Sequence, residues 1–477
     1  MTLKDQTISA LLWTLVDKVG TQIAYFITGV IMADLLDVSD FGLIGMLSIF
    51  VLLTTIFIDG GFTSALIRYQ DTNEDDYSTV FYVNMGMSIL LYALLYMSAP
   101  LIAEYYDQPR LIPVSRVLFL SILFNSGGII QNTIYAKSIN FKIQTIANIV
   151  SLVLSGGIAL LLAWRGYGVW AIVYQTVSVS ILKTGLLWSV SKWRPRLVFK
   201  ISTIRRLFGF SSYLLLSQLV GIVQNMYSMM LGKHFSVTTV GYYTQAQKMS
   251  DMAISTINSP IQSSLFPVLS TINQEEDRLL NAFRKSMHFA CFLSFLFLPM
   301  LAITSKPFIL MFLRNKWFDS IVFLQILSIC GILSIITALV NTFLRVEGKS
   351  KHLLFVETIK AVITFSVLIA TIPYGAIAVV IGQLISRFLI CLFSMYMTAL
   401  KTNYSMIFQL KDIQSYIFIA LASFLVCYPV SYVITNIYLL FLIQNAVYLI
   451  AFASLNYLNK NVIIADIIDL VKNKIKK

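Results

Sequence analysis

Charge is scarce in this sequence, and its scarcity points to the class of protein. Only 12% of the 477 residues are Asp, Glu, Lys or Arg, whereas soluble proteins carry roughly 25%. Hydrophobic residues make up 58% of the chain and the mean hydropathy is +0.80. Apolar runs of about 20 residues, the length of a membrane-spanning α-helix, recur throughout. The sequence therefore predicts an all-α polytopic membrane protein, because the runs are too continuous for the alternating pattern of a membrane β-barrel.

Residues that build disulfides, metal sites and catalytic centres are also few. The four cysteines fall inside apolar runs and are interpreted as small hydrophobic residues, and the three histidines form no metal motif. No Ser-His-Asp constellation or loop pair of carboxylates is present. The stretch "VEGKSK" (346–351) resembles the end of a phosphate loop, but Phe343 replaces the glycine required upstream. We therefore expect a transporter without a resident cofactor rather than an enzyme or a nucleotide-driven pump.

The apolar runs predict about fourteen transmembrane helices. The first run is too long for a cleavable signal peptide and lacks a small-residue cleavage pattern. The expected spans are 9–33, 41–60, 79–103, 113–135, 144–164, 167–190, 208–231, 241–265, 286–305, 320–344, 353–372, 375–398, 413–434 and 437–458.

The distribution of Lys and Arg predicts the orientation of these spans. With a cytoplasmic N-terminus, 23 cations fall in cytoplasmic segments and 6 in the opposite loops. This bias follows the positive-inside rule and places both termini in the cytoplasm. The net charge of +13 is thus mainly a topology signal, and no nucleic-acid partner is expected. An additional role in binding anionic membrane lipids stays open for the basic segment 191–206.

An internal repeat divides the spans. Shifting the sequence by 199 residues aligns Val38 with Val237, Gly42 with Gly241 and Pro100 with Pro299. Six helices per repeat is an even number, so two six-helix lobes enter the membrane in the same direction, as a parallel repeat. We expect an N-lobe at 1–190, a cytoplasmic linker at 191–207, a C-lobe at 208–400, and two further helices with a basic cytoplasmic tail at 401–477.

Ten charged residues fall within the predicted spans, where charge is expensive and usually faces a partner or a cavity. Glu357 and Lys360 are three residues apart and are expected to pair locally. The remaining cations predict a cavity for a negatively charged cargo such as a phosphate or pyrophosphate. The predicted substrate-binding cations are Lys18, Lys248, Lys183 and Arg116, and the ion-coupling or charge-balancing acids are Asp17, Asp59 and Asp251. Snorkelling toward the interface stays open for Arg116 and Arg387.

A set of ordered motifs resembles the polysaccharide-transporter (Wzx-type, WzxC-like) flippases of the multidrug/oligosaccharidyl-lipid/polysaccharide exporter superfamily. The motifs are "DGGFTSALIR" (59–68), "SAPLIAEYY" (98–106), "AKSINFK" (136–142), "GYGVWAIV" (166–173), "WRPRLVF" (193–199), "GYYTQAQKMS" (241–250), "FPVLS" (266–270) and "NKW" (315–317).

The resemblance implies an inner-membrane flippase that moves undecaprenyl-pyrophosphate-linked oligosaccharide to the periplasmic leaflet by alternating access. It implies a central cavity lined by the first, second, seventh and eighth spans, a coupling H⁺ or Na⁺, and a polysaccharide polymerase and glycosyltransferases as partners. The chain departs from the family at Tyr227, where relatives often carry an acid. This departure leaves Asp17, Asp59 and Asp251 as the candidate ion-coupling acids.

Three other functions are alternatives to this one. An ion-coupled multidrug exporter of the same architecture would use the in-span carboxylates to bind organic cations. A lipid II flippase would share a pyrophosphate cargo. A membrane glycosyltransferase or polymerase would need a large periplasmic loop, and the longest expected here is about fourteen residues, 306–319.

Overall fold

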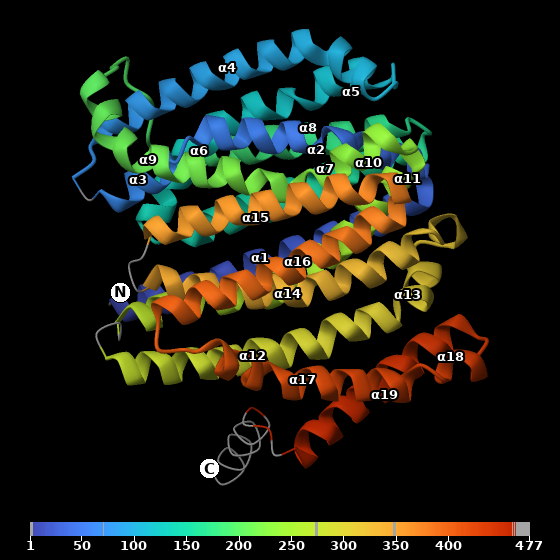
Figure 1. Cartoon of the computed structure of the whole chain (residues 1–477). Helices are drawn as coiled ribbons and strands as arrows, with labels where there is room; N and C mark the ends of the chain where they lie inside the picture. The colour runs from blue at the N-terminus through green and yellow to red at the C-terminus, as the bar shows by residue number, and fades with distance from the viewer. Residues whose placement is uncertain are drawn as a thin grey trace. The chain divides into compact units, whose positions relative to one another are not determined.

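The chain folds into helices. A computed structural model describes residues 3–69, 71–271, 275–346, 350–459, 461 and 463, and every regular element in these ranges is helical (Figure 1). The α-helices are α1 (Leu3–Leu35), α2 (Val38–Asp59), α3 (Phe62–Arg68), α4 (Glu74–Tyr105), α5 (Leu111–Leu118), α6 (Leu120–Lys137), α7 (Phe141–Trp164), α8 (Val169–Val190), α9 (Ile201–Gly221), α10 (Tyr227–His234), α11 (Val237–Thr271), α12 (Glu276–Ile303), α13 (Ser305–Phe312), α14 (Ser320–Val346), α15 (Ser350–Thr371), α16 (Ala376–Lys401), α17 (Met406–Cys427), α18 (Val430–Val433) and α19 (Ile437–Leu458).

The predicted all-α membrane fold is confirmed. Within the described residues, 13 helical segments are long and apolar enough to cross a membrane, each matching one predicted span. The fourteenth prediction, 241–265, falls on α11, which is 35 residues long but is not among these segments. Its polar run from Thr244 to Asp251 lowers the hydropathy. The helix therefore forms as predicted, but its sequence is too polar for an ordinary lipid-facing span.

Two predicted spans are interrupted helices. The span predicted at 208–231 consists of α9, a 3₁₀ turn (η1, Ile222–Asn225) and α10. The span predicted at 113–135 is divided into α5 and α6 at Phe119. The predicted outside loop 306–319 contains α13 and a second 3₁₀ turn (η2, Asn315–Trp317). A 3₁₀ turn inside a helix often marks a place where the helix bends during function.

The chain forms two compact units, residues 1–244 and 245–477. In the first unit α7 packs against α1 and α8, and a hydrophobic cluster that includes Phe81, Ile130 and Leu207 joins α4, α6 and α9. In the second unit α14 packs against α12 and α16, and α17 packs against α12 and α19. The four cysteines are buried and unpaired, as expected for small hydrophobic residues. The domain limits 1–190, 191–207, 208–400 and 401–477 stay predictions.

Structural features recur at the positions that the internal repeat pairs. Pro100 lies inside α4 and Pro299 lies inside α12. The sixth predicted span of each repeat, 167–190 and 375–398, corresponds to α8 and α16, and each of these helices begins directly after a glycine with positive φ, Gly168 at 56° and Gly375 at 99°. These matches tie the sequence repeat to repeated local structure.

The paired glycines Gly42 and Gly241, both in the first unit, make a reciprocal contact between α2 and the start of α11. A Cβ atom on Gly42 would lie 2.0 Å from the carbonyl oxygen of Val237, and one on Gly241 would lie 2.1 Å from that of Val38. Each glycine thus contacts the residue four positions before the other glycine. The two helix backbones approach too closely there for any side chain.

Candidate functional site

Asp17 interacts with residues of two other helices rather than with the neighbouring Lys18. Its half-buried carboxylate accepts a hydrogen bond from the Asn148 side chain on α7 at 3.0 Å. It is also an electrostatic partner of the half-buried Lys183 ammonium on α8. Adjacent residues of a helix project about 100° apart, so Lys18 points in a different direction from Asp17, and it is exposed. The Asp17 carboxylate thus acts electrostatically on Lys183, a second predicted site residue, whereas Lys18 is exposed.

This pairing predicts energetic coupling between Asp17 and Lys183. We expect Lys183→Met to lower the thermal stability of the detergent-solubilised protein, because it removes a cation that interacts electrostatically with the Asp17 carboxylate. In the double variant with Asp17→Asn, about 1 kcal/mol of this loss should be recovered, which is typical of interacting neighbours. Lys18→Met is the matched control and should combine additively with Asp17→Asn. Equal coupling for both lysines would contradict the pairing.

Asp59 lies at the end of α2, beside a cavity within the first unit. Its carboxylate accepts a hydrogen bond from the Gly61 amide at 3.3 Å. Gly60 and Gly61 both have positive φ, at 51° and 79°, a conformation that glycine adopts without strain. The "DGG" motif therefore forms a tight turn that fixes the carboxylate at the cavity. The cavity measures about 290 Å³ and is lined by Thr55, Ile58, Asp59, Thr63, Ile122, Asn125, Ser126, Ile129 and Asn132.

The second unit holds the remaining predicted acid and the third lysine. Asp251 on α11 is exposed and has Arg387 on α16 as an electrostatic partner. Lys248, one turn earlier on α11, is half-buried. Lys360 donates to Glu357 at 2.9 Å within α15, which confirms that this buried pair is local. The Arg387 guanidinium thus acts electrostatically on Asp251, and its snorkelling toward the interface stays a prediction.

Arg116 lies apart from these groups, on α5. Its guanidinium lies 4.3 Å from the ring centroid of Tyr96 and its Nε donates to the Tyr96 carbonyl at 3.4 Å. A cation over an aromatic face gains about 0.5–2 kcal/mol depending on its exposure. Arg116 is therefore held on α4 by stacking.

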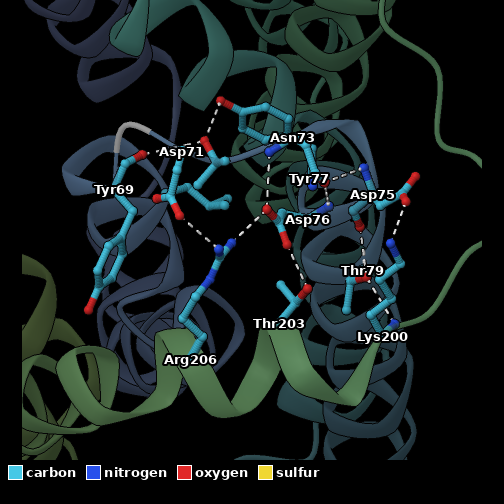
Figure 2. Close-up of polar contacts among 12 residues, drawn as sticks. Tyr69, Asp71, Asn73, Asp75, Asp76, Tyr77, Thr79, Lys200, Thr203 and Arg206 are labelled. Carbon is cyan, nitrogen blue, oxygen red and sulfur yellow. Dashed lines mark hydrogen bonds and ion pairs between the residues drawn. The ribbon is translucent and has the colours of Figure 1, made fainter.

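A charge cluster that the sequence did not predict joins the start of α4 to the linker and α9 (Figure 2). Arg206 lies between Asp71 and Asp76, donating to them at 3.0 and 2.6 Å, and Thr203 donates to the buried Asp76 at 2.6 Å. Lys200 donates to Asp75 at 2.6 Å and Arg196 pairs with Glu74. Because half of the six cations in 191–206 are paired with acids, fewer remain for lipid headgroups.

A second unpredicted network surrounds the buried Asp412 of α17. Arg284 of α12 donates to both carboxylate oxygens, at 2.8 and 2.7 Å, and the Tyr404 hydroxyl donates at 2.7 Å. His288 Nε2 lies 3.6 Å from the same carboxylate. Burial raises the pKa of Tyr404 well above its ordinary value, so the hydroxyl keeps the proton that it donates. This network holds α17 on α12.

Asparagine inside an apolar span is a signal of a polar contact that a search for charged residues alone does not detect. Asn148 contacts Asp17, and Asn125 and Asn132 line the cavity beside Asp59. Asp412 gave no comparable signal, because it was predicted to lie in a cytoplasmic loop.

Comparison with known sequences identifies the relatives of this chain. A family model described as polysaccharide biosynthesis protein matches residues 31–322. The teichuronic acid biosynthesis protein TuaB of Bacillus subtilis (strain 168) is 26% identical over 417 residues, covering 85% of each chain. The succinoglycan biosynthesis transport protein ExoT of Rhizobium meliloti (strain 1021) is 23% identical, and the match covers 76% of this chain and 73% of ExoT. The lipopolysaccharide biosynthesis protein WzxC of Escherichia coli (strain K12) is 22% identical, and the match covers 73% of this chain and 72% of WzxC.

Comparison with solved structures identifies the fold. The lipid II flippase MurJ in an inward closed conformation superposes with a TM-score of 0.77 at 16% identity, covering 95% of this chain and 99% of MurJ. An inward-facing multidrug resistance MATE family transporter of the MOP superfamily gives a TM-score of 0.64 at 14% identity, and the superposition covers 82% of this chain and 94% of the transporter. Because the family model covers more than half of the sequence, the chain belongs to the polysaccharide biosynthesis protein family, and it shares the multi-pass helical fold of MurJ and of a MATE transporter of the MOP superfamily.

Proposed function

We propose that the protein is a flippase that moves undecaprenyl-pyrophosphate-linked oligosaccharide from the cytoplasmic to the periplasmic leaflet for surface polysaccharide assembly. The observation that carries this proposal is the family match, accompanied by relatives named for teichuronic acid, succinoglycan and lipopolysaccharide biosynthesis. A lipid-linked glycan is the cargo that such pathways make at a membrane. The fold agrees, because a flippase of another lipid-linked molecule shares it.

The proposed mechanism is alternating access, with cationic side chains receiving the pyrophosphate. Lys18, Lys183, Lys248 and Arg116 are the proposed anion-binding residues, and Asp17, Asp59 and Asp251 the proposed coupling or balancing acids. The Asp17–Lys183 interaction suits a site that exchanges partners, since an arriving anion competes with Asp17 for the lysine. The exchange is driven by the same electrostatic complementarity that steers charged ligands into clefts.

The proposed setting is the bacterial inner membrane, with both termini in the cytoplasm. The distribution of 23 against 6 loop cations supports this orientation. Glycosyltransferases that build the cargo and a polymerase that consumes it are the proposed partners.

An ion-coupled multidrug exporter is the second candidate. The specific observation in its favour is the Asp59 carboxylate beside a cavity, in a fold shared with a multidrug transporter. An acid in a cavity attracts organic cations, so this candidate makes a different prediction about cargo charge. The family match and the curated relatives favour the lipid-linked glycan.

The test is reconstitution of the full chain into proteoliposomes. One set carries lipid-linked oligosaccharides extracted from cells that express the protein, and another carries ethidium. We expect the sugar headgroups to cross the membrane, measured as their accessibility to an added glycosidase, at least tenfold faster than in protein-free liposomes. Ethidium transport with no movement of sugar headgroups would replace this proposal by the exporter.

A further inference from the structure

The cavity beside Asp59 combines a largely apolar wall with several polar side chains. One carboxylate, two amides and three hydroxyls share it with three isoleucines. Defects in apolar helix packing are lined by apolar side chains and stay empty. Ligand pockets of roughly 300–1,000 Å³ combine an apolar wall with a few convergent polar groups, and this cavity of about 290 Å³ is at their lower end.

The polar groups are presented in rows by two helices. On α6, Ile122, Asn125, Ile129 and Asn132 follow the three- and four-residue spacing that keeps side chains on one helix face. On α2, Thr55 and Asp59 are four residues apart and share a face in the same way. Thr63 of α3 adds a third side. Groups from three helices therefore converge on the same space.

The two asparagine amides have hydrogen-bonding capacity to spare. Within the described part of the chain, neither the Asn125 nor the Asn132 side chain hydrogen-bonds to another residue. Each amide offers two donor hydrogens and an acceptor oxygen. An amide in a membrane span that is not used for helix packing is expected to serve a ligand or a water-filled pathway.

We propose that Asp59, Asn125 and Asn132 form a subsite that binds the hydroxyl groups of one sugar residue of the transported cargo. This inference rests on the proposed function and extends it by assigning a sugar contact to a place distinct from the pyrophosphate-binding cations. A sugar hydroxyl donates to the carboxylate while it accepts from an amide, so acids and amides together suit it. The isoleucine side chains suit the C–H face of a sugar ring.

The alternative occupant is a coupling cation at Asp59. Cations such as Ca²⁺ are held by six to eight oxygens at about 2.3–2.6 Å, whereas this cavity has one carboxylate and far more space than an ion fills. The dimensions of the cavity, about 290 Å³, therefore favour the sugar.

The location fits the direction of transport. The predicted orientation places Asp59 and the C-terminal part of α6 at the cytoplasmic side, where the cargo is made. The cavity would therefore meet the sugar as the cargo enters.

The test compares two lipids on the full chain in nanodiscs. One is the lipid-linked oligosaccharide extracted from expressing cells, and the other is undecaprenyl pyrophosphate without sugar. We expect wild-type protein to bind the sugar-bearing lipid at least tenfold tighter. The double variant Asn125→Ala/Asn132→Ala should lose most of this difference in affinity between the two lipids, while its Kd for undecaprenyl pyrophosphate without sugar stays unchanged. Asn140→Ala, which removes an exposed amide at the start of α7, is the matched control and should keep the full ratio.

Three results would overturn the subsite in distinguishable ways. If the double variant still binds the sugar-bearing lipid at least tenfold tighter than the bare lipid, as wild type does, the sugar does not bind in this cavity. The proposed flippase function would be unaffected by that result. If Asp59→Asn keeps the ratio but abolishes the Na⁺ or H⁺ dependence of flipping, the cavity holds the coupling cation instead. Binding of neither lipid by wild type rejects the proposed function itself.

Discussion

Replacing Gly42 by alanine should reduce transport at least about fivefold while the protein still reaches the membrane. The new Cβ would lie 2.0 Å from the Val237 carbonyl oxygen, whereas carbon–oxygen contacts require about 3.3 Å or more. The starts of α2 and α11 must then separate by about 1 Å. Overpacking of this kind costs about 1–3 kcal/mol, which shifts a conformational equilibrium roughly 5- to 150-fold. A transporter that must pass through the conformation with this contact loses rate accordingly.

Gly241→Ala should have the same effect, because its Cβ meets the Val38 carbonyl oxygen at 2.1 Å in the reciprocal arrangement. The measurement is the rate of sugar-headgroup movement in proteoliposomes, normalised to the amount of reconstituted protein. Gly86→Ala and Gly157→Ala are matched controls, since a Cβ at either helical glycine meets nothing within 4 Å. Transport by Gly42→Ala at the rate of these controls would show that the α2–α11 contact is not part of the cycle.

The helices could be predicted from the sequence because the bilayer imposes their length. An apolar run near 20 residues has few alternatives to a spanning helix, so thirteen of the fourteen predictions coincide with observed membrane-length segments. The interruptions at Phe119 and at Ile222–Asn225 were not predicted, because hydropathy averages over a window and does not register a local change in hydrogen bonding. The family resemblance was confirmed by the match over 31–322.

The partners of the in-span charges were harder to predict. Spacing along one helix revealed Glu357–Lys360, because three residues make one helical turn. Asp17 accepts a hydrogen bond from Asn148 on α7 and interacts electrostatically with Lys183 on α8, and no pattern within α1 encodes either neighbour. Arg387, which interacts electrostatically with Asp251, likewise lies on another helix, α16. Tertiary packing decides which helices are neighbours. Charge partners on different helices could therefore be identified only from the structure.

The Asp412 network provides the largest expected change in stability. We expect Asp412→Ala to lower the free energy of unfolding by about 3 kcal/mol, because removing one member of a buried ion pair typically costs about 3–5 kcal/mol. The lower end applies because the Arg284 side chain is 38% exposed, although that of Asp412 is only 6% exposed. The loss also leaves the Tyr404 hydroxyl without its acceptor. Thermal unfolding of the detergent-solubilised protein measures the change.

Asp71→Ala is the matched control, since Asp71 also pairs with an arginine, at 3.0 Å from Arg206 Nη1, but its side chain is 70% exposed. Exposed ion pairs contribute about 0–1 kcal/mol, so this substitution should hardly change the melting temperature. A combined Asp412→Leu/Arg284→Met variant should be more stable than Asp412→Ala, because no charge is then left unpaired in the network. If Asp412→Ala and Asp71→Ala unfold at the same temperature, the attachment of α17 to α12 does not depend on this carboxylate. The apolar contacts of α17 with α12 and α19 would then be sufficient to hold it.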